Sequence, residues 1–317
     1  MQIPLDNNYN DLPKISITHQ PFEMNIPICT NCRCHEYITK RGFRKHIHKN
    51  PTQIYYCSKC KIKLINDPSS GFLYPLRIID KILDLHVYGV NAERIKDYII
   101  KNCKQEHPGI SFTRQTILNN IKKASERLSI IDQYFYHEKK GGEWQIDDCY
   151  QPLINGKVGH ITNVFSVKYR YWLSSFVTLE RDTNASLQAV INATMRAKYE
   201  PKIIKMDAYQ PHIKAADKVF PKTQIKVKSK KEYYGWVNYI ERLNRSMRFG
   251  AIKKKFCFRS LNQLQASATL TRVWYNFLKI HKSLKGNTPA VSVGITIPFH
   301  NWVDLLRYAY FLSWYIK

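Results

Sequence analysis

The order of the periodic segments in the second half of the chain is the feature that most constrains the fold. Three strand-like runs come first, and a helix, a strand, a short helix, a strand and two long helices follow. Strands alternate apolar and polar residues, whereas helices repeat apolar residues every three or four positions. This pattern predicts a domain that combines strands with helices. The strands are expected at 144–150, 160–167, 171–179, 202–206 and 224–227, and the long helices at 183–199, 237–247 and 261–281.

Carboxylates end two of these strands and lie on one of the helices. Asp147 and Asp148 end the first apolar run, Asp207 ends the fourth strand, and Glu241 lies in a helix dense with arginines. Such acids converge where strands and a helix meet, and hard divalent cations prefer oxygen ligands. The pattern therefore predicts nucleic-acid chemistry on bound metal ions. Two alternatives stay open: Glu241 and Arg245 are spaced as a surface ion pair, and Asp207 is placed to cap the following short helix.

The charge of the chain indicates a polyanionic partner. Its 317 residues include 50 lysines and arginines against 24 acidic residues, which gives a formal charge of +26. Nucleic acid is the leading partner for such a charge. A membrane is disfavoured, because no apolar stretch is long enough to cross one and no signal peptide is recognised. We expect a soluble, intracellular protein, and we interpret the apolar segment 302–316, which Asp304 and Arg307 interrupt, as a packing helix.

Two cysteine pairs near the start of the chain have the spacing of a metal site. Cys29-x-x-Cys32 and Cys57-x-x-Cys60 match a zinc ribbon, in which two knuckles place four thiolates around Zn²⁺. The alternative is two chance pairs of reduced thiols. A neighbouring residue is also open as a replacement ligand: Cys34, His35, His46 or His48. Zinc would organise a segment too small for its own core. A phosphate-facing surface is expected from Lys40, Arg41, Arg44, Lys45 and Lys49.

Between residues 75 and 128 the apolar residues repeat with helical spacing. Gly89 is placed to close a first helix, Asn91 to cap a second, and a third begins near Thr113. Three short helices of this kind predict a helix-turn-helix DNA-binding domain. A small helical spacer with a solvated charged face is the alternative. In the helix-turn-helix interpretation the third helix presents four residues to bases and phosphates: Arg114, Gln115, Asn119 and Lys122.

The order of strands, helices and acids resembles the ribonuclease-H-like core of DDE transposases and retroviral integrases. Three segments look like the acidic signatures of bacterial and archaeal insertion-sequence transposases: WQIDD at 144–148, MDAY at 206–209 and NYIERLN at 238–244. The resemblance covers roughly residues 139–290, and a zinc ribbon with a helical module also precedes the core in such proteins. It implies an α/β ribonuclease-H-like domain, with a mixed five-stranded sheet and flanking helices, behind a small zinc ribbon and an all-α helix-turn-helix domain.

The resemblance also implies roles for single residues. Asp147, Asp207 and Glu241 would hold two Mg²⁺ or Mn²⁺ ions, with Asp147 favoured over Asp148 as the first ligand. A water or a DNA 3′-hydroxyl would then attack a phosphodiester in line. A basic residue that contacts DNA usually lies seven positions after the glutamate, and here arginine replaces the more usual lysine. The DNA-contacting set on this helix is Asn244, Arg245 and Arg248.

The expected function is that of a DDE transposase, which binds the ends of a mobile element and cuts and joins DNA. Its partners would be double-stranded DNA, as element ends and target, and further copies of the chain, because two ends must be brought together. Such proteins are cytoplasmic and of prokaryotic type. The expected domains are an N-terminal arm (1–28), the zinc ribbon (29–70), the helix-turn-helix domain (71–136), the catalytic domain (137–285) and a C-terminal packing tail (286–317).

Three other functions are weighed against this one. A transposase-derived DNA-binding protein without catalysis is the main alternative, although all three acids are present. A ribonuclease-H-type nuclease would differ only in failing to join the cleaved end. A tyrosine recombinase is disfavoured, because none of the 11 histidines begins the His-x-x-Arg box that this chemistry normally requires.

Overall fold

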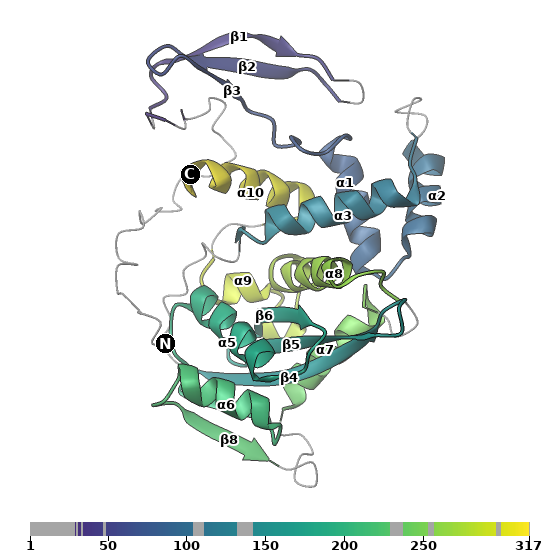
Figure 1. Cartoon of the computed structure of the whole chain (residues 1–317). Helices are drawn as coiled ribbons and strands as arrows, with labels where there is room; N and C mark the ends of the chain where they lie inside the picture. Colours follow the sequence, from purple (N-terminus) through teal and green to yellow (C-terminus); the bar gives the residue numbers. More distant parts are fainter. Residues whose placement is uncertain are drawn as a thin grey trace.

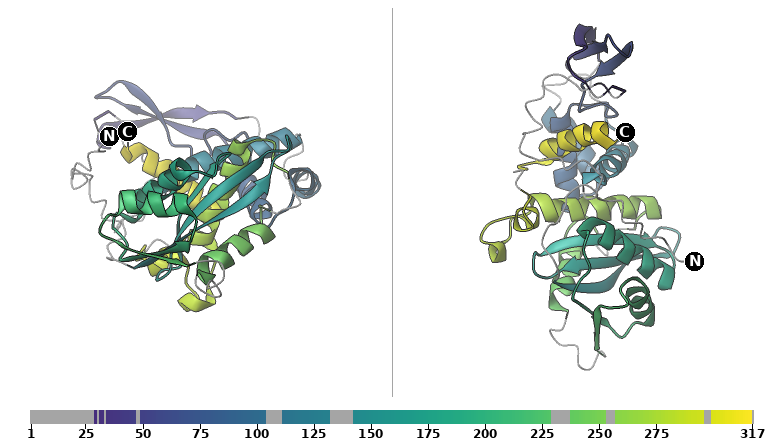
Figure 2. Two further views of the ribbon diagram at one scale, coloured as in Figure 1. Left: turned by 60° about the horizontal axis from the view of Figure 1, so that its bottom comes forward. Right: turned by 90° about the vertical axis from the view of Figure 1, so that its left-hand side faces the viewer.

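The computed structural model describes residues 29, 31–32, 34–46, 49–103, 111–131, 142–228, 237–252, 257–295 and 299–316. The predicted N-terminal arm and His48 lie outside these residues. Three units follow one another along the long direction of the molecule: a small β-sheet, a layer of helices, and a larger sheet with helices on both faces (Figure 1, and Figure 2, right).

The small sheet is an antiparallel ribbon in the strand order β1-β2-β3. Its own apolar core is minimal, because the buried set consists of Tyr55 and Leu64 together with Cys29 and Cys57. A sheet with so few buried side chains needs a further constraint to be stable. Its strands are β1 (Ile38–Arg44), β2 (Thr52–Cys57) and β3 (Ile62–Ile65).

The helical layer begins with three helices where the sequence predicts them. Gly89, at φ +78°, closes the first helix, and the Asn91 side chain accepts a hydrogen bond from the Arg94 N–H at the start of the second. Thr113 caps the third helix, as its side chain accepts a hydrogen bond from the Thr116 N–H. These helices are α1 (Leu76–Val87), α2 (Ala92–Cys103) and α3 (Arg114–Leu128).

The larger sheet has the strand order β6-β5-β4-β7-β8. β4, β5 and β6 are antiparallel neighbours, whereas β7 runs parallel to β4 and β8 parallel to β7. Three antiparallel strands followed by two parallel ones form the mixed sheet of the ribonuclease-H-like fold, so the predicted fold class is confirmed. The strands are β4 (Glu143–Pro152), β5 (Val158–Ser166), β6 (Tyr171–Thr178), β7 (Ile203–Asp207) and β8 (Gln224–Lys228).

Helices cover both faces of this sheet, and each face has its own core. Trp144 and Ile146 of β4 pack in one cluster with Ala189 of α5, whereas Cys149 packs in another with Leu243 of α7. The helices are α5 (Thr183–Ala197), α6 (Gln210–Val219), α7 (Asn238–Phe249) and α8 (Leu261–Val273). Shorter helical segments follow: η4 (Trp274–Leu278), η5 (Lys282–Leu284) and α9 (Pro289–Ser292).

Two boundaries differ from the expectation. β4 continues to Pro152, because its pairing with β5 extends to the Pro152–Val158 pair, so Asp147 and Asp148 lie within the strand and not at its end. The last long helix ends as α-helix at Val273 and finishes with one π-helical turn, η4. A π turn inserts an extra residue that periodicity alone does not reveal.

The segment 302–316 forms helix α10 (Trp302–Ile316), which returns to the helical layer and packs on α1 and α3 (Figure 1). Its N-terminus is fixed where the Trp302 N–H donates to the Asp80 carboxylate, at 2.9 Å. One continuous core joins residues of α1, α3, α10 and the α5 face of the sheet. None of the helices in the described part of the chain is long and apolar enough to span a membrane.

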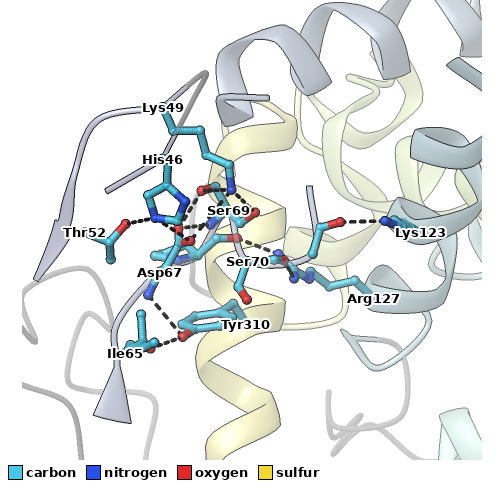
Figure 3. Close-up of polar contacts among 12 residues, drawn as sticks. His46, Lys49, Thr52, Ile65, Asp67, Ser69, Ser70, Lys123, Arg127 and Tyr310 are labelled. Atoms are coloured by element: carbon cyan, nitrogen blue, oxygen red, sulfur yellow. Dashed lines mark hydrogen bonds and ion pairs between the residues drawn. The ribbon is translucent and has the colours of Figure 1, made fainter. Parts of the chain in front are cut away.

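Polar contacts fix the segment between β3 and α1 (Figure 3). The Tyr310 hydroxyl of α10 accepts from the Asp67 N–H at 3.1 Å and donates to the Ile65 carbonyl at 2.6 Å. From α3, Arg127 donates to the Pro68 and Ser70 carbonyls. The ribbon is therefore attached both to α3 and to α10.

Lys49 takes part in this junction and does not face solvent. Its Nζ donates to the Ser69 carbonyl and hydroxyl, each at 3.0 Å, and lies 3.8 Å from the Asp67 carboxylate (Figure 3). Only 10% of its side chain is exposed. Lys49 is therefore not part of the predicted phosphate-facing surface of the ribbon, because it pairs with the buried Asp67.

Candidate active site

Asp147 and Asp148 are consecutive in β4 and therefore point to opposite faces of the sheet. Asp147 lies on the face covered by α7, where the Asn244 side chain donates to it at 2.8 Å. Burial, followed by the negative charges of Asp207 and Asp148, raises the pKa of Asp147 to about 7. A half-buried carboxyl beside two further carboxylates is an environment that a bound cation would stabilise.

Asp148 is already neutralised on the opposite face. Its carboxylate accepts from the Arg181 Nε at 2.7 Å and lies 3.5 Å from the His212 Nε2, and only 6% of its side chain is exposed. His212 is buried, and its Nδ1 lies 2.9 Å from the Ser186 hydroxyl. Burial lowers the pKa of His212, and the charge of Asp148 opposes that shift. Because Arg181 already forms an ion pair with Asp148, the Asp147 carboxylate is better placed to bind a metal ion.

A chain of buried amides holds Asp147. Asn163 is the cross-strand partner of Asp147 on β5, and its side-chain amide donates to the side-chain oxygen of Asn244 at 2.8 Å. Asn244 in turn donates to Asp147. Asn244 is only 4% exposed, so it does not lie on the DNA-facing surface that the sequence analysis expected. The Asn244 side-chain oxygen accepts from Asn163, and its nitrogen donates to Asp147. This position indicates that Asn244 orients Asp147.

Gln145 fixes the start of helix α7. This helix has no side-chain cap from its own N-cap residue, Val237. Instead, the buried Gln145 side chain of β4 accepts from the Ile240 N–H at 3.1 Å, and Gln145 donates to Glu143 at 3.0 Å. Backbone N–H groups in the first helical turn require such partners. The contact sets the register of α7 against β4 and so places Glu241, the next residue, in the first turn beside the Asp147 face.

The two competing interpretations of the acids can now be compared with the structure. Among the described residues, Glu241 has neither a hydrogen bond nor an ion pair through its carboxylate, so the expected surface pair with Arg245 does not form. The Asp207 carboxylate accepts from the Tyr209 N–H at 3.3 Å, just before α6. Asp207 therefore contributes to the turn into α6 while its charge still acts on Asp147.

The charge of Asp207 acts on Asp147, but among the described residues the three acids do not form a compact ligand cluster. Within the part of the chain that the structure describes, the four cysteines are the group of close metal-ligating side chains, and Asp147, Asp207 and Glu241 do not form a second one. The carboxylates would have to move closer together around an ion. Burial and then the negative charge of Asp207 raise the pKa of Asp147, and the repulsion between these two carboxylates opposes that approach without a cation.

The cysteine cluster fits a zinc ion. The sulfur atoms of Cys29, Cys32, Cys57 and Cys60 all lie within 4.8 Å of one another. Tetrahedral zinc with bonds of about 2.3 Å requires sulfur atoms about 3.8 Å apart, and the Cys32 and Cys57 sulfurs are 3.8 Å apart. Burial first, and contacts among the thiols second, raise the pKa of Cys57 and of Cys60. Four thiolates at this spacing therefore require a cation.

Two of the alternative zinc ligands, Cys34 and His46, are engaged elsewhere. The Cys34 thiol donates to the Cys32 carbonyl at 3.2 Å, and the His46 Nε2 lies 2.9 Å from the Thr52 hydroxyl. His35 is exposed and lies outside the cluster of close ligands. The geometry thus favours four-cysteine coordination among the described residues.

The predicted DNA-contacting residues are mostly at the surface. On α3 the four side chains are exposed; Gln115 donates to Asn119 at 2.9 Å, and Lys122 lies 3.8 Å from Glu126. On α7, Arg245 is exposed, whereas Arg248 is half-buried with its guanidinium 6.0 Å from the Tyr150 ring. Arg114, the remaining predicted DNA-contacting residue of α3, is exposed as well.

Sequence reasoning missed Gln145, Asn163, Arg181 and His212. One signal was available for Gln145, which is polar at a position where the strand period requires burial. The other three contact Asp148 or Asn244 only because separate strands and helices meet in the fold. No local pattern encodes those meetings.

Among solved structures, chains similar to this one are retroviral integrases. The HTLV-2 integrase catalytic core domain in complex with magnesium is 11% identical in its trimeric form, over 48% of this chain and 95% of that chain, with a TM-score of 0.34. Its dimeric form is 12% identical over 49% and 96%, with a TM-score of 0.34. The simian T-cell lymphotropic virus intasome in complex with PP2A regulatory subunit B56 gamma is 12% identical over 65% and 74%, with a TM-score of 0.37.

No family model matches this chain, and no curated protein matches it. The fold assignment therefore rests on the strand order and strand directions of the larger sheet.

Proposed function

We propose that this chain is a DDE transposase, which binds the ends of a mobile element and catalyses divalent-metal-dependent cleavage and strand transfer of DNA. One observation carries the proposal. The half-buried Asp147 carboxylate accepts from Asn244 of α7 and experiences the charge of Asp207, and Asn244 lies one turn after Glu241, which has no ion pair among the described residues. In this proposal, carboxylates from β4, β7 and α7 act together as metal ligands.

The proposed ligands are Asp147, Asp207 and Glu241. Two Mg²⁺ or Mn²⁺ ions held there would activate an attacking water or 3′-hydroxyl and stabilise the charge that develops on the leaving oxygen. Gln145, Asn163 and Asn244 do not contact substrate in this proposal. They keep Asp147 and the first turn of α7 in position, and so place the carboxylates before DNA arrives.

Basic residues beside the acids supply the electrostatic attraction for DNA. Arg245 is exposed on α7, one turn after Glu241, and Arg248 lies one turn further. The whole chain has a formal charge of +26, which favours association with a polyanion. The exposed side chains of α3 are proposed to contact element ends, and zinc in the four-cysteine cluster is proposed to maintain the ribbon. We further propose that several copies assemble, so that two DNA ends meet.

A strand-transfer assay tests the proposal. The purified protein is incubated with labelled, precleaved ends from the DNA that flanks this gene and with a supercoiled plasmid, in Mg²⁺ or Mn²⁺. Label is expected to enter the plasmid with the wild type and not with Glu241→Gln, which retains the size of the side chain but removes its charge. Binding without cutting or joining would favour an inert DNA-binding protein, and cutting without joining would favour a nuclease.

A further inference from the structure

Strand β1 of the zinc ribbon exposes nearly all of its side chains. It is an edge strand, since the strand order of the ribbon is β1-β2-β3, and each residue after Ile38 is exposed. In Figure 1, β1 is the outermost strand, on the side of the ribbon away from the helices. Ile38 packs against the ribbon core, and the rest of β1 contributes neither face to a core.

The charge of this surface has one sign. Between Lys40 and Lys63 the sequence contains eight lysines and arginines and no acidic residue. Lys49 is held inside by Asp67, but Lys40, Arg41 and Arg44 of β1 are exposed. A row of cations along an extended strand complements the regularly spaced phosphates of a nucleic acid.

A large apolar side chain lies within this row. Phe43 is 66% exposed, with Arg44 after it and Arg41 before it across Gly42. Edge strands usually carry charge in order to avoid pairing with other proteins, so the cations alone need no further function. An exposed phenylalanine has the opposite effect, because it increases the tendency to aggregate. Phe43 is the observation that edge protection does not explain.

The backbone holds Phe43 in a defined position. The pairing of β1 with β2 shifts between Lys40 and Gly42, which marks a bulge, and Gly42 has φ +109°. The Gln53 side chain donates to the Gly42 carbonyl at 2.7 Å, and Phe43 is the cross-strand partner of Gln53. The bulge therefore sets the direction of the strand immediately before Phe43.

Aromatic rings next to this strand already lie under cations. The Arg41 guanidinium lies 5.1 Å from the centre of the Tyr56 ring, and the Lys59 ammonium lies 5.3 Å from that of Tyr37. These two rings are covered by cations of the same sheet. Among the described residues, no cation lies over the Phe43 ring. Of the three rings of Tyr37, Phe43 and Tyr56, that of Phe43 is therefore the one available to a partner.

We propose that β1 is a DNA-contacting strand in which Phe43 inserts between base pairs of duplex DNA, while Arg41 and Arg44 bind the flanking phosphates. Apolar side chains that enter the minor groove in this way unstack a base step and bend the duplex. The inference rests on the proposed function in one respect, namely that the partner is duplex DNA. It adds a specific contact that the α3 surface and the catalytic acids do not provide.

An anionic membrane surface is the less favoured partner. Interfacial membrane binding requires an extended apolar face together with cations. On β1 a single apolar side chain stands among cations, an arrangement that suits one base step between two phosphates. Vesicles of anionic phospholipid therefore serve as the comparison in the test.

The test uses the full-length, zinc-loaded protein and duplexes from the DNA that flanks this gene, with 2-aminopurine at successive positions. No magnesium is added, so that binding is measured without cleavage. The wild type is expected to increase the fluorescence of 2-aminopurine at one base step, because unstacking removes its quenching. Phe43→Ala is expected to abolish this increase and to weaken binding about ten-fold, whereas Phe43→Trp is expected to retain both.

Salt dependence separates the ring from the cations. Phe43→Ala should leave the slope of log affinity against log salt unchanged, whereas Arg44→Ala should reduce it by about one. Ile280→Ala is the matched control, because Ile280 is 68% exposed but lies in the sheet domain, and it should bind as the wild type does. Zinc content measured for each variant shows whether the ribbon remains folded.

Three results would overturn the proposal. The first is equal affinity and fluorescence for Phe43→Ala and the wild type. The second is a Phe43 effect on binding to anionic vesicles without one on DNA. The third is failure of the wild type to bind DNA, which would also overturn the proposed function. A Phe43-dependent fluorescence signal in a protein that fails the strand-transfer assay would support the inserted contact and refute only the catalytic proposal.

Discussion

Two neighbouring aspartates in β4 show how one residue position decides a role. Asp148 is paired with Arg181 and lies near His212, whereas among the described residues Asp147 accepts from neutral donors and lies beside further acids. Alternation along a strand separates the two side chains onto opposite faces. The sequence signature contains both acids, and the contacts from Arg181 just before α5, from His212 of α6 and from Asn244 of α7 distinguish them.

Metal binding at Asp147 is expected to depend on pH. Its pKa is raised from 3.8 to about 7, so the folded, metal-free protein retains a proton that the unfolded chain releases. This contribution to stability is complete below about pH 4 and is lost as the pH rises toward 7. A cation requires the ionised carboxylate, so its affinity should fall about ten-fold for each pH unit below 7.

Thermal unfolding with and without Mg²⁺ checks this expectation. The increase in Tm that Mg²⁺ produces should be larger at pH 8 than at pH 6. Asp147→Asn, which cannot ionise, should remove most of the Mg²⁺ effect at both values. An equal Mg²⁺ effect at the two pH values in the wild type would contradict the assignment.

Asn244 is expected to act through Asp147. In Asn244→Ala, Asp147 loses its side-chain donor and keeps the Asp148 N–H, and Asn163 loses the Asn244 acceptor, so the carboxylate is held less firmly. Strand transfer should fall by about 10–100-fold, and the affinity for Mg²⁺ should fall with it, as for other groups that orient metal ligands. DNA affinity measured without Mg²⁺ should change less than two-fold. Arg245→Ala is the matched control on the same helix, and it should show the reverse pattern: weaker DNA binding with unchanged Mg²⁺ dependence.

At the scale of elements, the positions of the strands and helices in the chain follow from local sequence patterns. The contacts that hold these elements against one another do not. The five strands of the larger sheet and the helices α1, α2, α3, α5 and α7 lie close to their predicted positions, because period and capping residues are local. The extension of β4 to Pro152 depends on its pairing with β5. The capping of α7 by Gln145 joins residues 95 positions apart, and the burial of Asn244 depends on Asn163.

Tyr310 is expected to be the residue of α10 that fixes the ribbon. Tyr310→Phe leaves the Asp67 N–H and the Ile65 carbonyl without their shared partner, at a cost of about 1–3 kcal/mol in the free energy of unfolding. Denaturant unfolding measures this loss, and limited proteolysis should show faster cleavage between β3 and α1. Tyr98→Phe, at an exposed tyrosine of α2, should leave both measurements unchanged. Equal proteolysis of the two variants would show that Arg127 and Lys49 suffice to hold the segment.

For the whole molecule, the distribution of cores predicts how it unfolds. One core joins the helical layer, α10 and one face of the sheet, whereas the ribbon core is separate. The expected division of residues 71–317 into three domains stays a prediction, but a shared core favours a single unfolding transition for them.

Removal of zinc tests this division. A chelator with higher affinity for Zn²⁺ than for Mg²⁺ should unfold the ribbon and weaken DNA binding, because four close thiols lose their cation. The main thermal transition of the remaining protein should shift by only a few degrees. Cys57→Ser should reproduce the effect, and Cys257→Ser, at an exposed cysteine outside the cluster, should not. Loss of the main transition on chelation would show that the ribbon and the other units unfold together.

The bond between Asp67 and Tyr310 also has a consequence for biosynthesis. Its two residues are 243 positions apart, and a ribosome synthesises the ribbon long before it reaches α10. The cysteines can bind zinc early, but the ribbon acquires its fixed orientation only after Tyr310 has left the exit tunnel. A nascent chain can therefore hold a folded ribbon that is not yet oriented on α3, and that orientation awaits the synthesis of α10.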